Sequence, residues 1–110
     1  ILGHSNCGGV EYSYKTLFDK KNINNFEYIN QWISCLQNSY NNIPNDFSDT
    51  EKLTFFEQEN IKQSIKNLRE YDCIDKLINE NKLNVIGLWY QLNSGLIKFL
   101  DKNNSFTNLD

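Results

Sequence analysis

The stretch Ile1-Leu2-Gly3-His4-Ser5-Asn6-Cys7-Gly8-Gly9-Val10 opens the chain and joins an apolar start to a loop of small and polar residues. The first three residues are typical of the end of a buried strand. The cluster from Gly3 to Gly9 predicts a tight turn from a strand into a helix. Because loops of this kind often carry the chemistry of a domain, we take this one as the candidate functional segment.

Two helices are predicted in the middle of the chain. Apolar residues recur every three or four positions from Asn25 to about Tyr40, which is typical of an amphipathic helix, and residues 41–47 end it. The sequence Ser48-Asp49-Thr50-Glu51 has the form of a capping box. The apolar stripe behind that box predicts a second long helix that extends to about Glu70.

The last third of the chain predicts a short helix and a strand. Residues 74–78 suggest the helix, and Leu83 to Tyr90 is rich in β-branched and aromatic residues, which favour a strand. The turn Asn93-Ser94-Gly95 should close a hairpin with residues 96–100, and the polar tail from Lys102 should fray. The order strand, helix, helix, strand indicates the α/β class.

Composition excludes several classes of function. The 110 residues are 39% hydrophobic, with seven Phe, six Tyr and two Trp, which is enough for a core. A net charge of −3 without a basic block argues against nucleic-acid binding. Apolar runs stay well below the roughly 18 residues that a membrane helix needs, so we expect no membrane span.

The cysteines and the start of the chain bear on its context. Cys7, Cys35 and Cys73 are too few for a disulfide-stapled secreted domain, so free or metal-bound thiols in a reducing compartment are expected. We therefore favour an intracellular protein, cytoplasmic or organellar. The chain contains no methionine and begins inside an apparent strand, so we expect a piece of a longer protein whose targeting signals lie outside it.

His4 and Cys7 are the candidate metal ligands. Imidazole and thiolate are both preferred by zinc, and they stand three positions apart on a loop that is followed by two glycines. Gly8 and Gly9 would permit a close approach and unusual backbone dihedrals. Such a short spacing also arises by chance in many proteins, so on spacing alone metal binding and a chance pairing are equally good interpretations.

The octapeptide from Gly3 to Val10 resembles the GHSxCGG signature of β-class carbonic anhydrases, in which the His and the Cys are two of three protein zinc ligands. The similarity continues through Ile29-x-x-Trp32-Ile33 and Glu59-Asn60-Ile61-x-x-Ser64-Ile65-x-x-Leu68. It ends in Gly87-x-x-Tyr90-x-x-x-x-Gly95, where Gln91 replaces the family's usual acid. We therefore expect a partial β-carbonic anhydrase domain over residues 1–101 and a polar tail over residues 102–110.

The resemblance implies a fold and an activity. The fold would be a parallel-core sheet with flanking helices and a closing hairpin, incomplete in this fragment. The activity would be the zinc-dependent, reversible hydration of carbon dioxide to bicarbonate and a proton through a zinc-bound hydroxide, in a homodimer or higher homo-oligomer. His4 and Cys7 would bind zinc.

The family's C-x-D-x-R segment, which provides the third zinc ligand and an Asp/Arg dyad, is absent from this sequence. A catalytic zinc site needs three protein ligands. The resemblance therefore places no catalytic residue within the fragment, and we expect the fragment alone to be inactive.

Other interpretations remain open. The chain could be a truncated or inactive homologue that serves as a binding or assembly subunit, or it could act on another small linear molecule such as carbon disulfide. Cys7 could instead be a nucleophile activated by His4. That reading is weaker, because His4 is the only histidine and the loop does not match a G-x-S-x-G elbow.

The remaining notable residues are expected to be structural. Cys35 and Cys73 could substitute as the third ligand, but buried cysteines are common in cores. Trp32, Phe56 and Trp89 are most simply core residues at helical or strand spacing. The cluster Glu57-Gln58-Glu59 is most simply a solvated helix face without a catalytic role.

Overall fold

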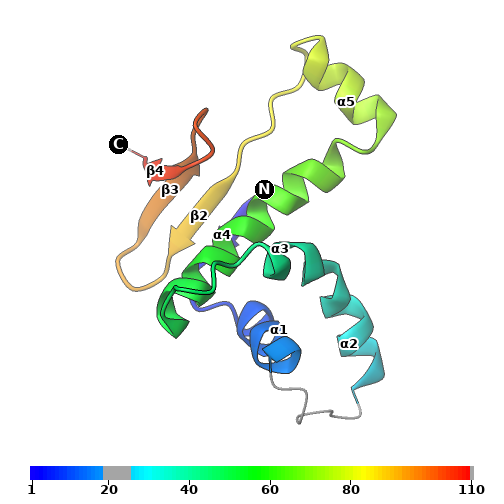
Figure 1. Cartoon of the computed structure of the whole chain (residues 1–110). Helices are drawn as coiled ribbons and strands as arrows, with labels where there is room; N and C mark the ends of the chain where they lie inside the picture. The colour runs from blue at the N-terminus through cyan, green and yellow to red at the C-terminus, as the bar shows by residue number, and fades with distance from the viewer. Residues whose placement is uncertain (19–25, 110) are drawn as a thin grey trace.

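The computed structural model describes residues 1–18 and 26–109, which form a four-stranded sheet and a set of helices (Figure 1). The helical elements are α1 (Gly8–Phe18), α2 (Glu27–Ile33), the 3₁₀ turn η1 (Ser34–Leu36), α3 (Gln37–Asn41), α4 (Asp49–Leu68) and α5 (Asp72–Asn79). The strands are β1 (Leu2–His4), β2 (Leu88–Gln91), β3 (Leu96–Leu100) and β4 (Phe106–Asn108).

The sheet is mixed and follows the order β1-β2-β3-β4. β1 and β2 are parallel, with His4 opposite Tyr90, whereas β2-β3 and β3-β4 are antiparallel. Gly95 has a φ of 71°, a conformation that glycine adopts without steric cost, and it ends the turn between β2 and β3. The predicted α/β class and the closing hairpin are confirmed.

Helix α4 lies against β1 and β2, and it supplies two of the five buried apolar side chains among the described residues. Phe56 is fully buried and Ile61 nearly so, and they share the core with Trp89 from β2. The capping box is confirmed, because Ser48 Oγ accepts from the Glu51 amide while the Glu51 carboxylate accepts from the Ser48 amide. The helix ends at Leu68, close to the predicted Glu70.

The segment predicted as one helix from 25 to 40 is broken into α2, η1 and α3, and Asn25 lies outside the described residues. A 3₁₀ turn has about three residues per turn, so it rotates the following face relative to an α-helix. In these three elements only Ile33 and Ser39 are buried. Trp32 is 69% exposed, so its assignment to the core was wrong, whereas those of Phe56 and Trp89 are confirmed.

Two predictions for the last third of the chain were also wrong: the start of β2 and the fraying of the tail. β2 begins at Leu88 rather than Leu83. The pairing of β2 with β1 starts at Leu88, opposite Leu2, so residues 83–87 have no partner in β1. The described part of the tail, residues 102–109, does not fray, since Phe106 of β4 pairs with Leu100 of β3. The Asp101 carboxylate accepts from the amides of Asn103 and Ser105, which forms the turn that returns the chain to β3.

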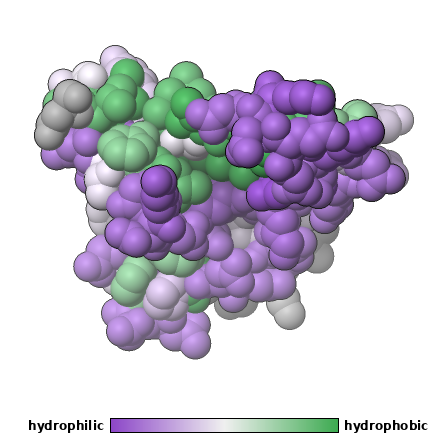
Figure 2. Space-filling model, turned by 90° about the horizontal axis from the view of Figure 1, so that it is seen from above, coloured by the Kyte–Doolittle hydropathy of each residue, from purple (hydrophilic) through white to green (hydrophobic). Residues whose placement is uncertain are grey.

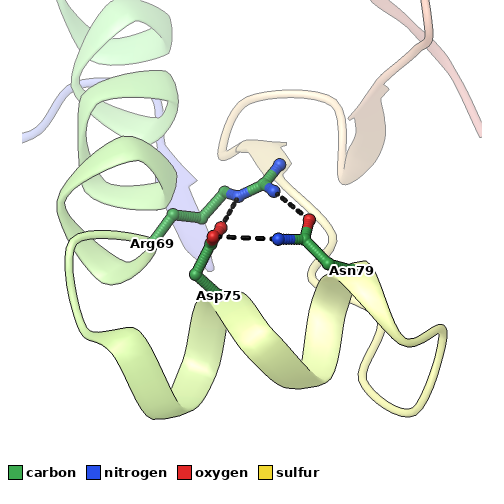
Figure 3. Close-up of polar contacts among 3 residues, drawn as sticks. All are labelled: Arg69, Asp75 and Asn79. Carbon is green, nitrogen blue, oxygen red and sulfur yellow. Dashed lines mark hydrogen bonds and ion pairs between the residues drawn. The ribbon is translucent and has the colours of Figure 1, made fainter.

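A polar cluster at the end of α4 attaches α5 to it (Figure 3). Arg69 donates to Asp75 at 2.8 Å and to Asn79 at 2.9 Å, and the Asn79 amide donates to Asp75 at 3.0 Å. The Arg69–Asp75 pair is exposed, so we expect it to contribute at most about 1 kcal/mol. The cluster links α5 to the end of α4, and its three residues do not line the cavity of the candidate site.

Large apolar side chains remain exposed on the surface, among them Leu2, Tyr28 and Trp32. Figure 2 shows hydrophobic residues gathered on one face beside a broad hydrophilic region. Exposed apolar patches of this kind are common at interaction surfaces. Within residues 1–18 and 26–109, every helix is too short or too polar to cross a membrane.

Candidate functional site

The loop between β1 and α1 is anchored to the end of β2. The Ser5 amide donates to the Tyr90 carbonyl at 2.9 Å, and the Leu92 amide donates to the Ser5 hydroxyl at 2.9 Å. Ser5 is itself buried. Both the backbone amide and the buried hydroxyl of Ser5 therefore hold the loop against the end of β2.

Asn6 makes the sharp turn of this loop. Its φ is 53°, in the left-handed region that asparagine tolerates better than most residues. The Glu11 amide donates to the Cys7 carbonyl at 2.9 Å, so α1 starts directly behind the turn. The role expected for Gly8 and Gly9 was wrong: neither has a positive φ, and a β-carbon at Gly8 would meet no atom within 4 Å.

His4 is exposed at the end of β1, and one of its ring nitrogens is already engaged. Its Nδ1 lies 2.9 Å from the Ser5 carbonyl oxygen. A carbonyl oxygen only accepts hydrogen bonds, so Nδ1 carries the proton in the neutral ring and Nε2 keeps a free lone pair. This tautomer is the one that a metal-binding histidine adopts when a backbone carbonyl orients it.

His4 and Cys7 line one cavity of about 320 Å³. Its walls come from β1, from the start of α1, from the α2-η1 segment and from α4, and they include apolar residues such as Val10, Ile33 and Ile61. Largely apolar cavities with a few polar groups are typical of small-molecule sites. The two predicted ligands therefore face a common space that a small ligand could enter.

Glu57 from α4 reaches the same loop, so the prediction that it lies on a solvated face was wrong. It is only 7% exposed, and its carboxylate accepts from the Cys7 amide at 3.4 Å and from Trp89 Nε1 at 3.3 Å. Burial raises the pKa of Glu57, and the hydrogen bonds from Cys7, Trp89 and the Asn6 backbone, together with the nearby His4, partly oppose that rise. The carboxylate connects the loop, the helix and β2.

The sequence contained a signal for Glu57. It lies four residues after Leu53 and four before Ile61, so helical periodicity places it on the apolar face of α4. A carboxylate at such a position is buried only when it has partners. Those partners are distant in sequence, and the pattern alone did not identify them.

A third metal ligand is not present in the described part of the chain, because no group of three or more His, Cys, Asp or Glu side chains gathers closely enough there to hold a metal ion. Cys35 lines the same cavity as His4 and Cys7, but it is exposed and forms no such group with them. Cys73 is exposed on α5. The expectation that Cys35 is a buried core residue was therefore wrong.

Comparison with known sequences identifies the family. The carbonic anhydrase family model matches residues 1–97. β carbonic anhydrase 3 of Arabidopsis thaliana is 29% identical over 98 residues, which are 86% of this chain and 38% of that protein. A carbonic anhydrase of Helicobacter pylori is 29% identical over 103 residues, which are 88% of this chain and 45% of that protein.

Solved structures agree on the fold. The β-carbonic anhydrase CcaA superposes with a TM-score of 0.85 at 18% identity, over 99% of this chain and 53% of that one. One of two tetrameric β-carbonic anhydrases of Sordaria macrospora gives a TM-score of 0.72 at 24% identity, over 96% of this chain and 51% of that one. The chain thus spans less than half the length of the two curated relatives and about half of the two solved chains. It belongs to the carbonic anhydrase family and forms a β-class region of it.

Proposed function

We propose that the protein containing this chain is a zinc-dependent carbonic anhydrase that converts carbon dioxide reversibly to bicarbonate and a proton, with His4 and Cys7 as two of its zinc ligands. The observation that carries the proposal is the bond of His4 Nδ1 to the Ser5 carbonyl at 2.9 Å, which leaves Nε2 available beside the cavity that Cys7 also lines.

The residues present fit zinc. An imidazole nitrogen and a sulfur form a donor set that zinc prefers and that magnesium and calcium do not. The Ser5 carbonyl accepts the hydrogen bond from Nδ1 and so orients the ring, as backbone carbonyls do for histidine ligands in known zinc sites. Two ligands are fewer than a catalytic site needs, so the third would come from outside the described residues.

When bound, zinc supplies hydroxide at neutral pH by lowering the pKa of a water molecule to about 7. The part of this chain is to hold His4 and Cys7 in place and to shape the space beside them. The buried Ser5 fixes the loop against β2, and the apolar wall around Val10 and Ile61 limits the water in the cavity. A small, uncharged substrate such as carbon dioxide suits such a wall.

We extend the proposal to a homo-oligomer. The solved relatives from Sordaria macrospora are tetrameric, and Tyr28 and Trp32 of this chain are 84% and 69% exposed. Large exposed aromatic side chains are enriched in the cores of protein interfaces. The α2 face that carries them is therefore the surface that we expect a second subunit to cover.

The test is a carbon dioxide hydration assay on the product of the complete reading frame that encodes this chain. Zinc-loaded wild type should accelerate hydration, and a chelator should abolish the acceleration. His4→Ala and Cys7→Ser should fall to the uncatalysed rate, whereas Cys73→Ser on the distant α5 should keep the wild-type rate. A zinc-loaded wild type without activity would favour the alternative of an inactive binding or assembly subunit.

A further inference from the structure

Glu57 is a buried carboxylate that the zinc chemistry proposed above does not use. It lies on α4 between Phe56 and Ile61, which are both in the core. Taking a carboxylate out of water is costly unless donors compensate it. The Cys7 amide donates to Oε1 and Trp89 Nε1 donates to Oε2, so each oxygen has a donor, and the Asn6 backbone also hydrogen-bonds the carboxylate.

The Cys7 amide lies just outside the first turn of α1. Amides at a helix start have no partner within the helix, and the helix dipole favours a negative charge there. Glu57 provides both the acceptor and the charge, although it comes from a different helix and 50 residues further along the chain. This contact therefore fixes where α1 begins relative to α4.

The same contact acts on the Cys7 side chain. Asn6, directly before Cys7, has a left-handed φ of 53°, and the Cys7 carbonyl accepts the first bond of α1 from the Glu11 amide. With its amide bound to Glu57 and its carbonyl bound to Glu11, the Cys7 backbone is held on both sides. The direction of its Cα–Cβ bond, and so the region that Sγ can reach, follows from that backbone.

We propose that Glu57 is a positioning residue for Cys7: its carboxylate holds the Cys7 amide so that Sγ is presented to zinc together with His4. The inference rests on the proposed function, because it needs Cys7 to bind the metal. Glu57 is not itself a ligand in this account. Both of its oxygens are occupied by N–H donors, and its action on the metal passes through the Cys7 backbone.

The most informative variant is Glu57→Gln. A carboxylate accepts at both oxygens, whereas an amide accepts at one and donates at the other end. Either the Cys7 amide or the Trp89 indole would then face an NH₂ group, at almost unchanged side-chain volume. Loss of a group that hydrogen-bonds a metal-binding residue typically lowers metal affinity by about 10–100-fold, and we expect a loss in that range for zinc.

The experiment measures zinc affinity by chelator competition, on the product of the complete reading frame after metal removal and reloading. Cobalt(II) loading gives a second readout, because the intensity of the sulfur-to-cobalt absorption band rises with the number of thiolates bound to the metal. Glu57→Gln should weaken zinc binding and reduce this band. The matched control is Glu80→Gln, an exposed carboxylate at the end of α5 that is paired with Lys82, and it should match wild type.

Thermal unfolding of the metal-free proteins separates positioning from a general loss of fold. The inference predicts weaker zinc binding at a temperature where metal-free Glu57→Gln is still folded. If this variant fails to fold, Glu57→Asp retains the charge but shortens the reach, and it should also bind zinc more weakly than wild type. Wild-type affinity and an unchanged cobalt band in the folded variant would overturn the inference alone. A wild-type protein that binds no zinc would instead overturn the proposed function and this inference with it.

Discussion

Gly3 and Ile61 lie so close together that a β-carbon on Gly3 would come within 2.7 Å of two side-chain carbons of Ile61. Glycine is therefore required for β1 to pack directly on α4. Gly3→Ala must displace either Ile61 or the strand, and overpacking of this kind costs about 1–3 kcal/mol. Denaturant unfolding of the complete protein should show a loss of stability in this range.

Gly8→Ala is the matched control for this prediction. A β-carbon at Gly8 meets no atom within 4 Å, and the residue starts α1 without a positive φ. Alanine is the better helix former, so the free energy of unfolding should stay the same or rise slightly. Equal losses in the two variants would contradict the packing explanation for Gly3.

Ser5→Ala should loosen the candidate loop. The substitution removes the hydroxyl that accepts the Leu92 amide at 2.9 Å, although the bond from the Ser5 amide to Tyr90 remains. Loss of one partly buried hydrogen bond should lower the free energy of unfolding by about 1 kcal/mol. Hydrogen exchange of the Leu92 amide should also become faster.

The control for the loop is Ser34→Ala. The Ser34 hydroxyl bonds only locally, to the Gln31 carbonyl three residues earlier, and it is exposed. Its removal should leave both the stability and the exchange of the Leu92 amide unchanged. An unaltered Leu92 exchange rate in Ser5→Ala would show that the hydroxyl does not anchor the loop.

Acid should weaken the start of α4. The backbone and side-chain hydrogen bonds with Ser48 lower the pKa of the Glu51 carboxyl below its usual value of 4.5. A group whose pKa is lower in the folded state stabilises the fold above the unfolded value and loses that contribution as the pH falls through the folded one. Stability should therefore decline below about pH 4.5 in part through Glu51.

Glu51→Gln tests that assignment. The amide oxygen can still accept from the Ser48 amide but has no charge to titrate, so the variant should lose less stability between pH 5 and pH 3 than wild type does. Unfolding curves at several pH values measure the difference. If the free energy of unfolding falls equally with pH in both proteins, the acid sensitivity comes from other carboxyl groups.

Local patterns predicted much of the fold. The capping box at Ser48 and the turn at Gly95 depend on neighbours in sequence, and both occur as expected. The prediction for Trp32 failed because apolar spacing shows that a helix has an apolar face but not whether this chain itself covers that face. β4 was missed because its stability comes from pairing with β3 rather than from its own residues.

The candidate site was predictable only in part. His4 and Cys7 are close in sequence, and their residue types indicate a metal. Glu57 contacts Cys7 and Trp89 across 50 and 32 residues, so its role depends on the folded arrangement of α4 against the loop. Asn6, rather than a glycine, makes the turn, and only the backbone geometry shows that.

X-ray absorption at the zinc edge of the zinc-loaded, complete protein tests the central claim most directly. If His4 and Cys7 bind the metal, the spectrum should contain a sulfur shell near about 2.3 Å and a nitrogen shell near about 2.0–2.1 Å, and Cys7→Ser should weaken the sulfur shell. A zinc site with oxygen neighbours only, or a sulfur shell unchanged in Cys7→Ser, would contradict the assignment of this loop as the metal site.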